Sequence, residues 1–243
     1  MNMNSSYITI NEAAKFLGVS IDTLRRWDKN GKLKAIRQQK NGYRYYPRET
    51  IELYLQDIFA IAKNWVTSLP TLPPTEHYCP DSLVFKARLG RLEKDLSKID
   101  EVKNIFPLIT AIVGEVGNNS YDHNLGNWPD IRGIFFAYDF NKRQIVLADR
   151  GQGLLKTLKK VRPSLNNDKE ALEVAFTEII SSRKPEARGN GLKFVRQVVS
   201  DNISFSIEFY SGSAKLFIKQ GSEELNIKSS DINYSGCVSL IKF

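Results

Sequence analysis

The sequence is short of several residue types, and each shortage narrows the class of protein. Its 243 residues include two cysteines, Cys79 and Cys237, which are too few for a disulfide framework. No apolar run approaches the roughly 20 residues that a membrane-spanning helix needs. The first residues, Met-Asn-Met-Asn-Ser-Ser, lack the basic flank and the apolar stretch of a secretory signal. We therefore expect a cytoplasmic protein with no membrane partner.

Acidic residues are scarce at the beginning of the chain. Residues 1–48 contain ten lysines and arginines against three acidic residues, which accounts for +7 of the total net charge of +8. The remaining residues are nearly neutral, with 25 basic and 24 acidic side chains. A local positive field of this kind favours contacts with nucleic-acid phosphates. A solvated basic surface is the alternative for a charge run considered alone.

This basic segment also has the pattern of two short helices joined by a tight turn. Thr9 and Glu12 form a capping box at the start of the first helix, and Gly18 suits the left-handed residue that ends it. Ser20 can cap a second helix that begins at Ile21. The pattern predicts a helix-turn-helix.

The second helix has the two faces that DNA recognition needs. Leu24 and Trp27 lie three residues apart and should point into the domain. Thr23, Arg25 and Arg26 are then left to face outward. This is the arrangement of a recognition helix in the major groove.

Turn signals farther along predict a β-wing. Asn30-Gly31 and Asn41-Gly42 flank one extended segment over residues 32–40, and residues 43–46 form the next. Tyr43 and Tyr46 could equally be packing residues or DNA contacts.

The turn, the Thr-Leu-Arg-Arg-Trp helix and the Tyr-Arg-Tyr wing resemble the winged helix-turn-helix of MerR and excisionase-like regulators over about fifty residues. The resemblance implies that double-stranded DNA is a partner. It places Thr23, Arg25 and Arg26 in the groove, and Arg44 and Tyr45 on the phosphates.

A proline-rich stretch divides the chain. Residues 49–66 have the pattern of a further helix, and the prolines between residues 68 and 75 then break any helix or central strand. We expect a DNA-binding domain over residues 1–66, a linker over 67–84 and a second domain over 85–243.

A polar stripe begins the second domain's candidate site. Glu115, Asn119 and His123 recur at steps of four along an apolar helical pattern, so they share one side of a helix. A carboxylate and an amide one turn apart can activate water and hold Mg²⁺, which takes oxygen ligands. An exposed polar stripe is the alternative for this cluster alone.

A carboxylate with two glycines follows. Two adjacent strands, over 133–139 and 144–148, lead into Asp149, Gly151 and Gly153. A buried carboxylate there can accept a hydrogen bond from an adenine amino group, while the glycines let a base approach the backbone.

A third cluster lies at the start of the next predicted helix. Arg188, Gly189 and Gly191 precede a helical pattern that continues to residue 199. Glycines at a helix start leave N–H groups for phosphate. Either glycine pair alone is a weak signal, because Gly-x-Gly also serves ordinary turns.

In this order the three clusters resemble the GHKL ATPase superfamily, which includes histidine kinases, gyrase, Hsp90 and anti-sigma-factor kinases. The similarity covers roughly residues 85–243 and includes a closing strand over 235–243. It implies ATP and Mg²⁺ as cofactors and a lid over residues 154–187. In the implied pocket, Glu115 is the general base, Asn119 is the Mg²⁺ ligand, and Asp149 accepts the adenine amino group beside Gly151 and Gly153. The further nucleotide contacts are His123, Arg188, Gly189 and Gly191. Ala187 and Cys237 depart from the usual glycine and threonine of this pattern.

Together the resemblances imply an α+β chain. An N-terminal winged helix-turn-helix would be followed by an α/β sandwich, in which helices cover one face of a mixed sheet. The nucleotide would lie between the sheet and the lid.

Three classes of function fit these features. We favour a DNA-binding transcriptional regulator whose ATP-binding or ATPase domain modulates its binding to DNA, to a regulatory protein or to a second copy in a homodimer. An anti-sigma-type protein serine/threonine kinase is the second class. An excisionase-like mobile-element factor with a non-catalytic nucleotide fold is the third. A sensor histidine kinase is not expected, because neither histidine, His77 or His123, lies on a separate phosphoacceptor helix.

Overall fold

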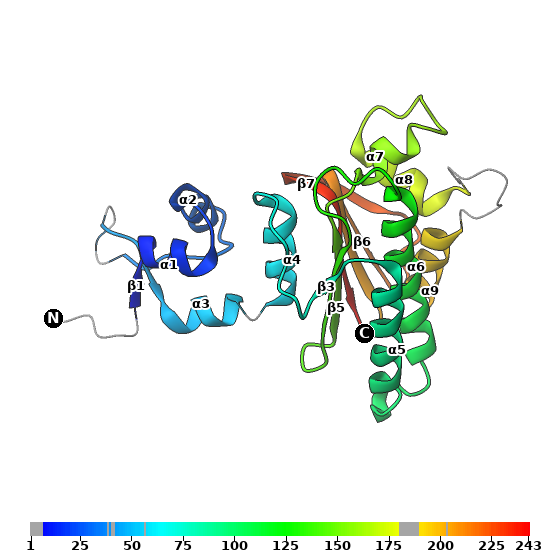
Figure 1. The fold of residues 1–243 in the computed structure, drawn as a ribbon, viewed down its shortest axis with the longest axis horizontal. Coiled ribbons are helices and arrows are strands. Elements are labelled where there is room, and N and C mark those ends of the chain that lie inside the picture. The colour runs from blue at the N-terminus through cyan, green and yellow to red at the C-terminus, as the bar shows by residue number, and fades with distance from the viewer. Residues whose placement is uncertain (1–6, 38, 40–41, 56, 180–189, 203) are drawn as a thin grey trace. The chain divides into compact units, whose positions relative to one another are not determined.

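The computed structural model describes residues 7–37, 39, 42–55, 57–179, 190–202 and 204–243 (Figure 1). The chain divides into two compact units, Met1–Ile61 and Ala62–Phe243. No helix in the described ranges is both long enough and apolar enough to cross a membrane.

Short helices and a two-stranded sheet form the first unit. Its two strands pair antiparallel, with Ile8 opposite Tyr46. The elements in chain order are β1 (Tyr7–Thr9), α1 (Ile10–Leu17), α2 (Ile21–Lys29), β2 (Tyr45–Pro47) and α3 (Arg48–Leu55), and α4 (Ile58–Thr67) runs across the boundary between the units.

The predicted helix ends are confirmed. The Thr9 N–H donates to a Glu12 carboxylate oxygen at 2.7 Å, and the Glu12 N–H donates to the Thr9 hydroxyl at 3.3 Å. Gly18 ends α1 with a φ of 62°, a left-handed conformation that glycine adopts without steric cost. The Ser20 hydroxyl accepts the N–H of Thr23 at the start of α2.

The predicted faces of α2 are confirmed except at Thr23, which was expected to face outward and is half-buried. Leu24 and Trp27 are buried in a small apolar core together with Tyr46, which is fully buried. Arg25 and Arg26 are exposed. Burying one stripe of this helix therefore leaves its basic residues on the surface.

In the part of residues 32–46 that the structure describes, the strands of the predicted wing pair at one bridge. Ile36 and Tyr45 exchange two backbone hydrogen bonds of 2.8 and 2.9 Å in an isolated bridge. Residues 45–47 pair instead with β1. Lys40 and Asn41, at the predicted turn, lie outside the described residues.

The single helix predicted over residues 49–66 is two helices. Asp57 lies between them, and its carboxylate accepts the N–H groups of Phe59 at 3.0 Å and Ala60 at 3.2 Å. An aspartate that caps the start of α4 in this way ends the preceding helical run.

A five-stranded sheet forms the centre of the second unit, in the order β3-β4-β5-β7-β6. The α+β class and the packing of helices on a sheet are confirmed. Every pairing among these strands is antiparallel, so the predicted mixed sheet is corrected to an antiparallel one. The elements are β3 (Tyr78–Cys79), α5 (Ser82–Leu96), the 3-10 helix η1 (Asp100–Val102), α6 (Phe106–Asn124), β4 (Ile134–Asp139), β5 (Gln144–Asp149), α7 (Gly153–Leu158), α8 (Asp168–Thr177), α9 (Gly191–Asp201), β6 (Ser206–Lys219) and β7 (Asn226–Lys242).

Part of the stretch predicted as a linker belongs to the second unit. Tyr78 of β3 pairs with Phe135 of β4. Arg88 of α5 donates to the carbonyl oxygens of Thr75 at 3.0 Å and Glu76 at 2.6 Å. These contacts join residues 75–79 to the sheet and to α5.

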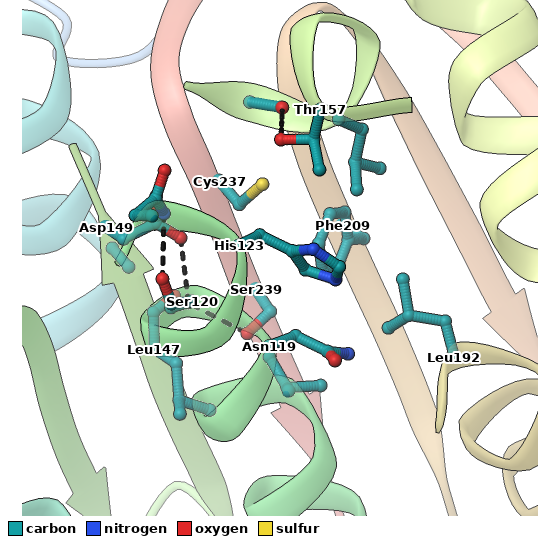
Figure 2. A pocket seen from close by; sticks show the side chains of 15 residues that line it. Asn119, Ser120, His123, Leu147, Asp149, Thr157, Leu192, Phe209, Cys237 and Ser239 are labelled. Carbon is teal, nitrogen blue, oxygen red and sulfur yellow. Dashed lines mark hydrogen bonds between the residues drawn. The ribbon is translucent and has the colours of Figure 1, made fainter. Parts of the chain in front are cut away.

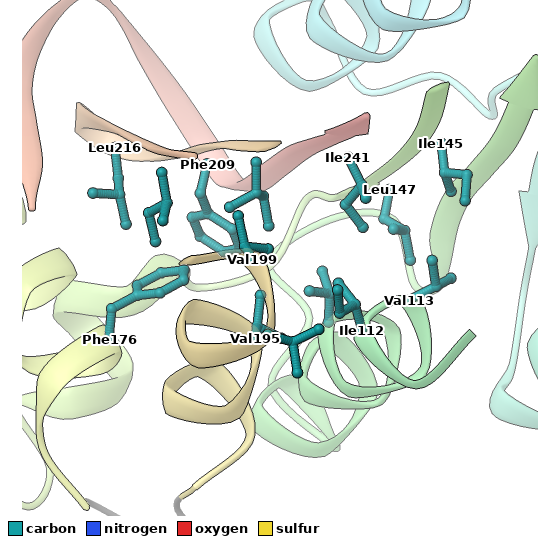
Figure 3. Packing of buried hydrophobic residues seen from close by; sticks show 14 of the residues in the cluster. Ile112, Val113, Ile145, Leu147, Phe176, Val195, Val199, Phe209, Leu216 and Ile241 are labelled. Atoms are coloured by element: carbon teal, nitrogen blue, oxygen red, sulfur yellow. The ribbon is translucent and has the colours of Figure 1, made fainter. Parts of the chain in front are cut away.

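Helices α5, α6, α8 and α9 lie on one face of the sheet (Figure 1). Phe176 of α8 packs edge-on against Phe209 of β6, with ring centroids 5.4 Å apart. Val195 and Val199 of α9 join the same buried cluster (Figure 3). This core holds α6, α9 and the ends of the strands in fixed positions, and the candidate site lies there.

The opposite face of the sheet is covered as well. Phe135 alternates along β4 with Phe136, which belongs to the core under the helices. The Phe135 ring lies 6.4 Å from that of Trp65 and 5.0 Å from that of His77. The prediction of cover on one face was therefore incomplete, although the continuous apolar run Ile-Phe-Phe-Ala over residues 134–137 is typical of a strand buried on both faces.

Candidate functional site

One pocket in the second unit gathers several of the predicted nucleotide residues. Asn119 and His123 from α6, Asp149 from the end of β5 and Gly153 from the start of α7 line it (Figure 2). Most of its other walls are apolar. The remaining lining residues are Val116, Ser120, Asn124, Leu147, Ala148, Leu154, Thr157, Leu192, Phe209, Cys237 and Ser239. A mainly apolar pocket with a few polar groups is typical of a small-molecule site.

Asp149 is the buried polar anchor of this pocket. It is 2% exposed, and its carboxylate accepts the Ser120 hydroxyl on one oxygen and the Gly151 N–H on the other, each at 2.8 Å. Burial raises the pKa of Asp149 to about 6, although the hydrogen bonds from Ser120 and Gly151 act in the opposite direction. An ionised carboxylate only accepts hydrogen bonds, so this group suits an amino donor on a ligand.

The sequence predictions missed the residues that hold this anchor. The Asn124 side chain donates to the Ser120 carbonyl oxygen and accepts the Gln152 N–H, each at 2.8 Å. A Cβ added to Gly151 would lie 2.1 Å from the Asn124 amide nitrogen. Gly151 is therefore needed for close approach to α6. The four-residue step between Ser120 and Asn124 was the available signal.

The start of α9 brings the third cluster against the first. A Cβ added to Gly191 would lie 2.3 Å from Glu115 Oε2 and 3.5 Å from Asn119 Nδ2. Glu115 is half-buried and lies beside Gly191, next to the lining residues of the pocket. Arg188 and Gly189, which are also predicted site residues, lie outside the described residues.

The closing strand also contributes to the pocket. Gly236 of β7 has a φ of 87°, and a Cβ there would lie 2.2 Å from the Asp149 carbonyl oxygen. Ser211 of β6 accepts the Leu154 N–H at 3.0 Å and donates to the Gly236 carbonyl oxygen at 3.2 Å. Burial and then the charge of Asp149 raise the pKa of the Cys237 thiol well above its ordinary value, so Cys237 is a neutral part of the wall.

Much of the predicted lid is packed structure. Leu172 and Phe176 of α8 are fully buried in the main core. The Asp168 carboxylate accepts the N–H and the hydroxyl of Ser213, each at 2.8 Å. Residues 168–177 therefore form a core helix, and the prediction of a lid over all of 154–187 was wrong for them. Residues 180–189 lie outside the described residues.

The chemistry of the site fits Mg²⁺ only together with a nucleotide. No group of three or more His, Cys, Asp or Glu side chains gathers as a metal site within the described ranges. The Glu115 carboxylate and the Asn119 amide both lie beside Gly191 at the start of α9, and each side chain has an oxygen that could bind the ion. Mg²⁺ commonly takes one or two protein ligands and completes its shell with water and phosphates.

Arg150 links the end of β5 to α4. Its side chain is 5% exposed and donates to Asp130, with the shortest of these contacts at 2.7 Å. It also donates to the carbonyl oxygens of Trp65 at 2.5 Å and Ser68 at 3.1 Å. The paired guanidinium thus satisfies carbonyl groups at the C-terminal end of a helix.

The first unit brings together some of the predicted DNA-binding residues. Arg25 and Arg26 of α2 line a surface hollow with Arg44. Thr23 and Tyr45 do not line it: the Thr23 hydroxyl lies 2.9 Å from that of Ser20, and the Tyr45 backbone forms the wing bridge. Lys29, Arg37 and one acidic residue, Asp28, also line the hollow.

Comparisons with known proteins identify the helix-turn-helix. Residues 9–46 match the family described as MerR family regulatory protein. The Type II methyltransferase M.Eco47II of Escherichia coli is 40% identical over 65 residues, which are 27% of this chain and 16% of the methyltransferase. The 43K ATPase domain of Thermus thermophilus gyrase B, solved with an aminocoumarin, matches 61% of this chain and 39% of its own, with 15% identity and a TM-score of 0.34. The chain thus spans well under two thirds of either protein. From the match over residues 9–46, the first unit carries a MerR-type helix-turn-helix.

Proposed function

We propose that the protein is a DNA-binding regulator whose second unit binds ATP with Mg²⁺, and that the nucleotide modulates its binding to DNA or to a protein partner. The convergence of three clusters that are far apart in the sequence supports this proposal. Asp149 anchors one end of the mainly apolar pocket, Asn119 and His123 line its side, and Gly191 packs against Glu115 and Asn119. A DNA-binding unit on the same chain supplies the output.

In this proposal each group has one role. Asp149 accepts the adenine amino group, and the apolar walls around Phe209 and Leu192 cover the base. Glu115 takes a proton from the attacking water. Asn119 would hold the metal ion, which would supply charge stabilisation at the phosphates.

Glu115→Gln is expected to separate hydrolysis from binding. Removing the base should lower the ATPase rate about a hundredfold, while ATP affinity changes only a few-fold, because the amide keeps the size and polarity of the side chain. Phosphate release and calorimetry on the full chain measure the two quantities. Glu93→Gln, on the exposed surface of α5, is the matched control. Unchanged hydrolysis in Glu115→Gln would remove Glu115 from the mechanism.

Arg26→Ala is expected to weaken DNA binding without changing ATP hydrolysis. The loss of one positive charge held in the groove between the phosphate backbones should reduce the slope of log affinity against log salt by about 1. Fluorescence anisotropy with mixed-sequence duplex DNA over a range of salt concentrations measures this slope. Arg91→Ala removes the same charge from an exposed position on α5 and should leave the slope as it is. Equal behaviour of the two variants would contradict the recognition-helix assignment.

A further inference from the structure

An acidic side chain lies among the arginines of the first unit. Asp28, near the C-terminal end of α2, has a side chain that is 7% exposed. One of its carboxylate oxygens accepts Arg44 Nε at 2.8 Å and also pairs with the Arg37 guanidinium. The other accepts the Ala35 N–H at 3.0 Å. Asp28 thus joins α2 to the residues that lead into and out of the wing.

The arginines that Asp28 holds also reach solvent. The side chains of Arg37 and Arg44 are 32% and 31% exposed. They line the hollow together with Arg25, Arg26 and Lys29, so five basic side chains surround one acidic one. A guanidinium carries five N–H donors in a fixed fork, and one carboxylate oxygen cannot occupy the donors of two guanidinium groups. The hollow is therefore complementary to an anion.

Asp28 remains ionised in this position. Burial alone would raise its pKa, but the hydrogen bonds from Arg44 and Ala35 and the charge of Arg37 outweigh burial and lower the pKa below its ordinary value. The pair interactions therefore persist at neutral pH.

We propose that Asp28 is a positioning residue for DNA-backbone binding, which holds Arg37 and Arg44 beside α2 so that these guanidinium groups contact a phosphate of duplex DNA. The inference rests on the proposed DNA binding and extends it to Arg37, which the sequence pattern did not indicate. Side chains held in place before binding lose less conformational entropy when the ligand arrives.

Simple electrostatics makes the opposite prediction, and this makes the inference testable. A negative side chain near DNA repels phosphate, so its removal should strengthen binding. Asp28→Asn keeps the size of the side chain and an oxygen that can accept the Ala35 N–H, but it loses the charge that holds the arginines. Glu49→Gln is the matched control, because Glu49 lies in the same unit, on α3, and is exposed.

The full chain is titrated into labelled mixed-sequence duplex DNA over a range of salt concentrations. We expect Glu49→Gln to bind as well as the wild type or a few-fold more tightly. Asp28→Asn should bind about tenfold more weakly, and its salt slope should be lower by about 1 to 2, because one or two phosphate contacts are lost. Tighter binding by Asp28→Asn, with an unchanged or steeper slope, would overturn the inference.

Two further measurements keep the outcomes separable. Arg37→Ala leaves Asp28 in place and should lower the salt slope by about 1; an unchanged slope would also overturn the inference, even if Asp28→Asn failed to fold. Wild-type protein that does not bind DNA would contradict the proposed function itself. Wild-type binding that Arg26→Ala weakens and Asp28→Asn strengthens would contradict the positioning role alone.

Discussion

Asp149→Asn is expected to abolish ATP binding while it makes the folded protein more stable at neutral pH. The Gly151 N–H requires an acceptor at one position of this side chain, so the new amide nitrogen takes the place of the oxygen that accepts the Ser120 hydroxyl. A donor then faces the adenine amino group. Sites built around a specific hydrogen bond reject a mismatched partner strongly, and we expect affinity to fall about a thousandfold.

The gain in stability follows from the pKa of Asp149. Burial raises it from 3.8 to about 6 in the folded state, so the folded protein binds a proton more readily than the unfolded chain does. Wild-type stability therefore falls as the pH rises between about 4 and 6, and the ionised carboxylate costs roughly 3 kcal/mol at neutral pH. Asparagine does not ionise, so the variant avoids this cost above pH 6 and loses its advantage below about pH 4.

Denaturant unfolding of both proteins across this pH range measures the difference, and calorimetry measures ATP binding. Wild-type affinity for ATP should fall as the pH drops below about 6, because the protonated acid is a poorer acceptor. Asp139→Asn, on the half-exposed end of β4, is the control and should change neither quantity. A variant that binds ATP normally would contradict the pocket assignment, whereas one that is less stable at neutral pH would show that the carboxylate stabilises the fold.

The features that the sequence predicted best are local ones. The capping box of Thr9 and Glu12 and the buried stripe of Leu24 and Trp27 depend on residues within one or two helical turns of each other. Periodicity alone also indicates α6 and the strands β4 and β5. The expectation that the three clusters share one site was a different matter, because it came from a family resemblance and not from a local pattern.

The missed features depend on contacts between distant residues. Arg150 bonds to Asp130, 20 positions away, and to Trp65, 85 positions away, and no local pattern indicates either pairing. The lid prediction was wrong at α8. It relied on the charged residues of this segment and gave too little weight to the apolar residues in Ala-Leu-Glu-Val-Ala-Phe over residues 171–176. Packing of its apolar face against the sheet stabilises this helix, because most helical stability in proteins comes from tertiary contacts.

Gly236→Ala is expected to destabilise the second unit by about 4 kcal/mol, because a positive φ and a steric clash add together. Its φ of 87° belongs to a region that side chains rarely adopt, and an added Cβ would lie 2.2 Å from the Asp149 carbonyl oxygen and 2.6 Å from the Gly151 nitrogen. These are backbone atoms and cannot rotate away. A loss of this size should lower the Tm by about 10 °C in a unit of this length.

Gly221→Ala separates the two causes. Gly221 has a φ of 70°, and an added Cβ would meet nothing within 4 Å, so this variant should show the backbone cost alone, about 1 kcal/mol. The difference between the two variants then measures how tightly the closing strand packs on the end of β5. Because the clash involves the backbone of Asp149, Gly236→Ala should also lose ATP binding at temperatures where it is still folded, whereas Gly221→Ala should keep it. Equal losses of stability in the two variants would mean that β7 does not pack tightly against Asp149, and that the hydrogen bonds from Ser120 and Gly151 hold this side chain without it.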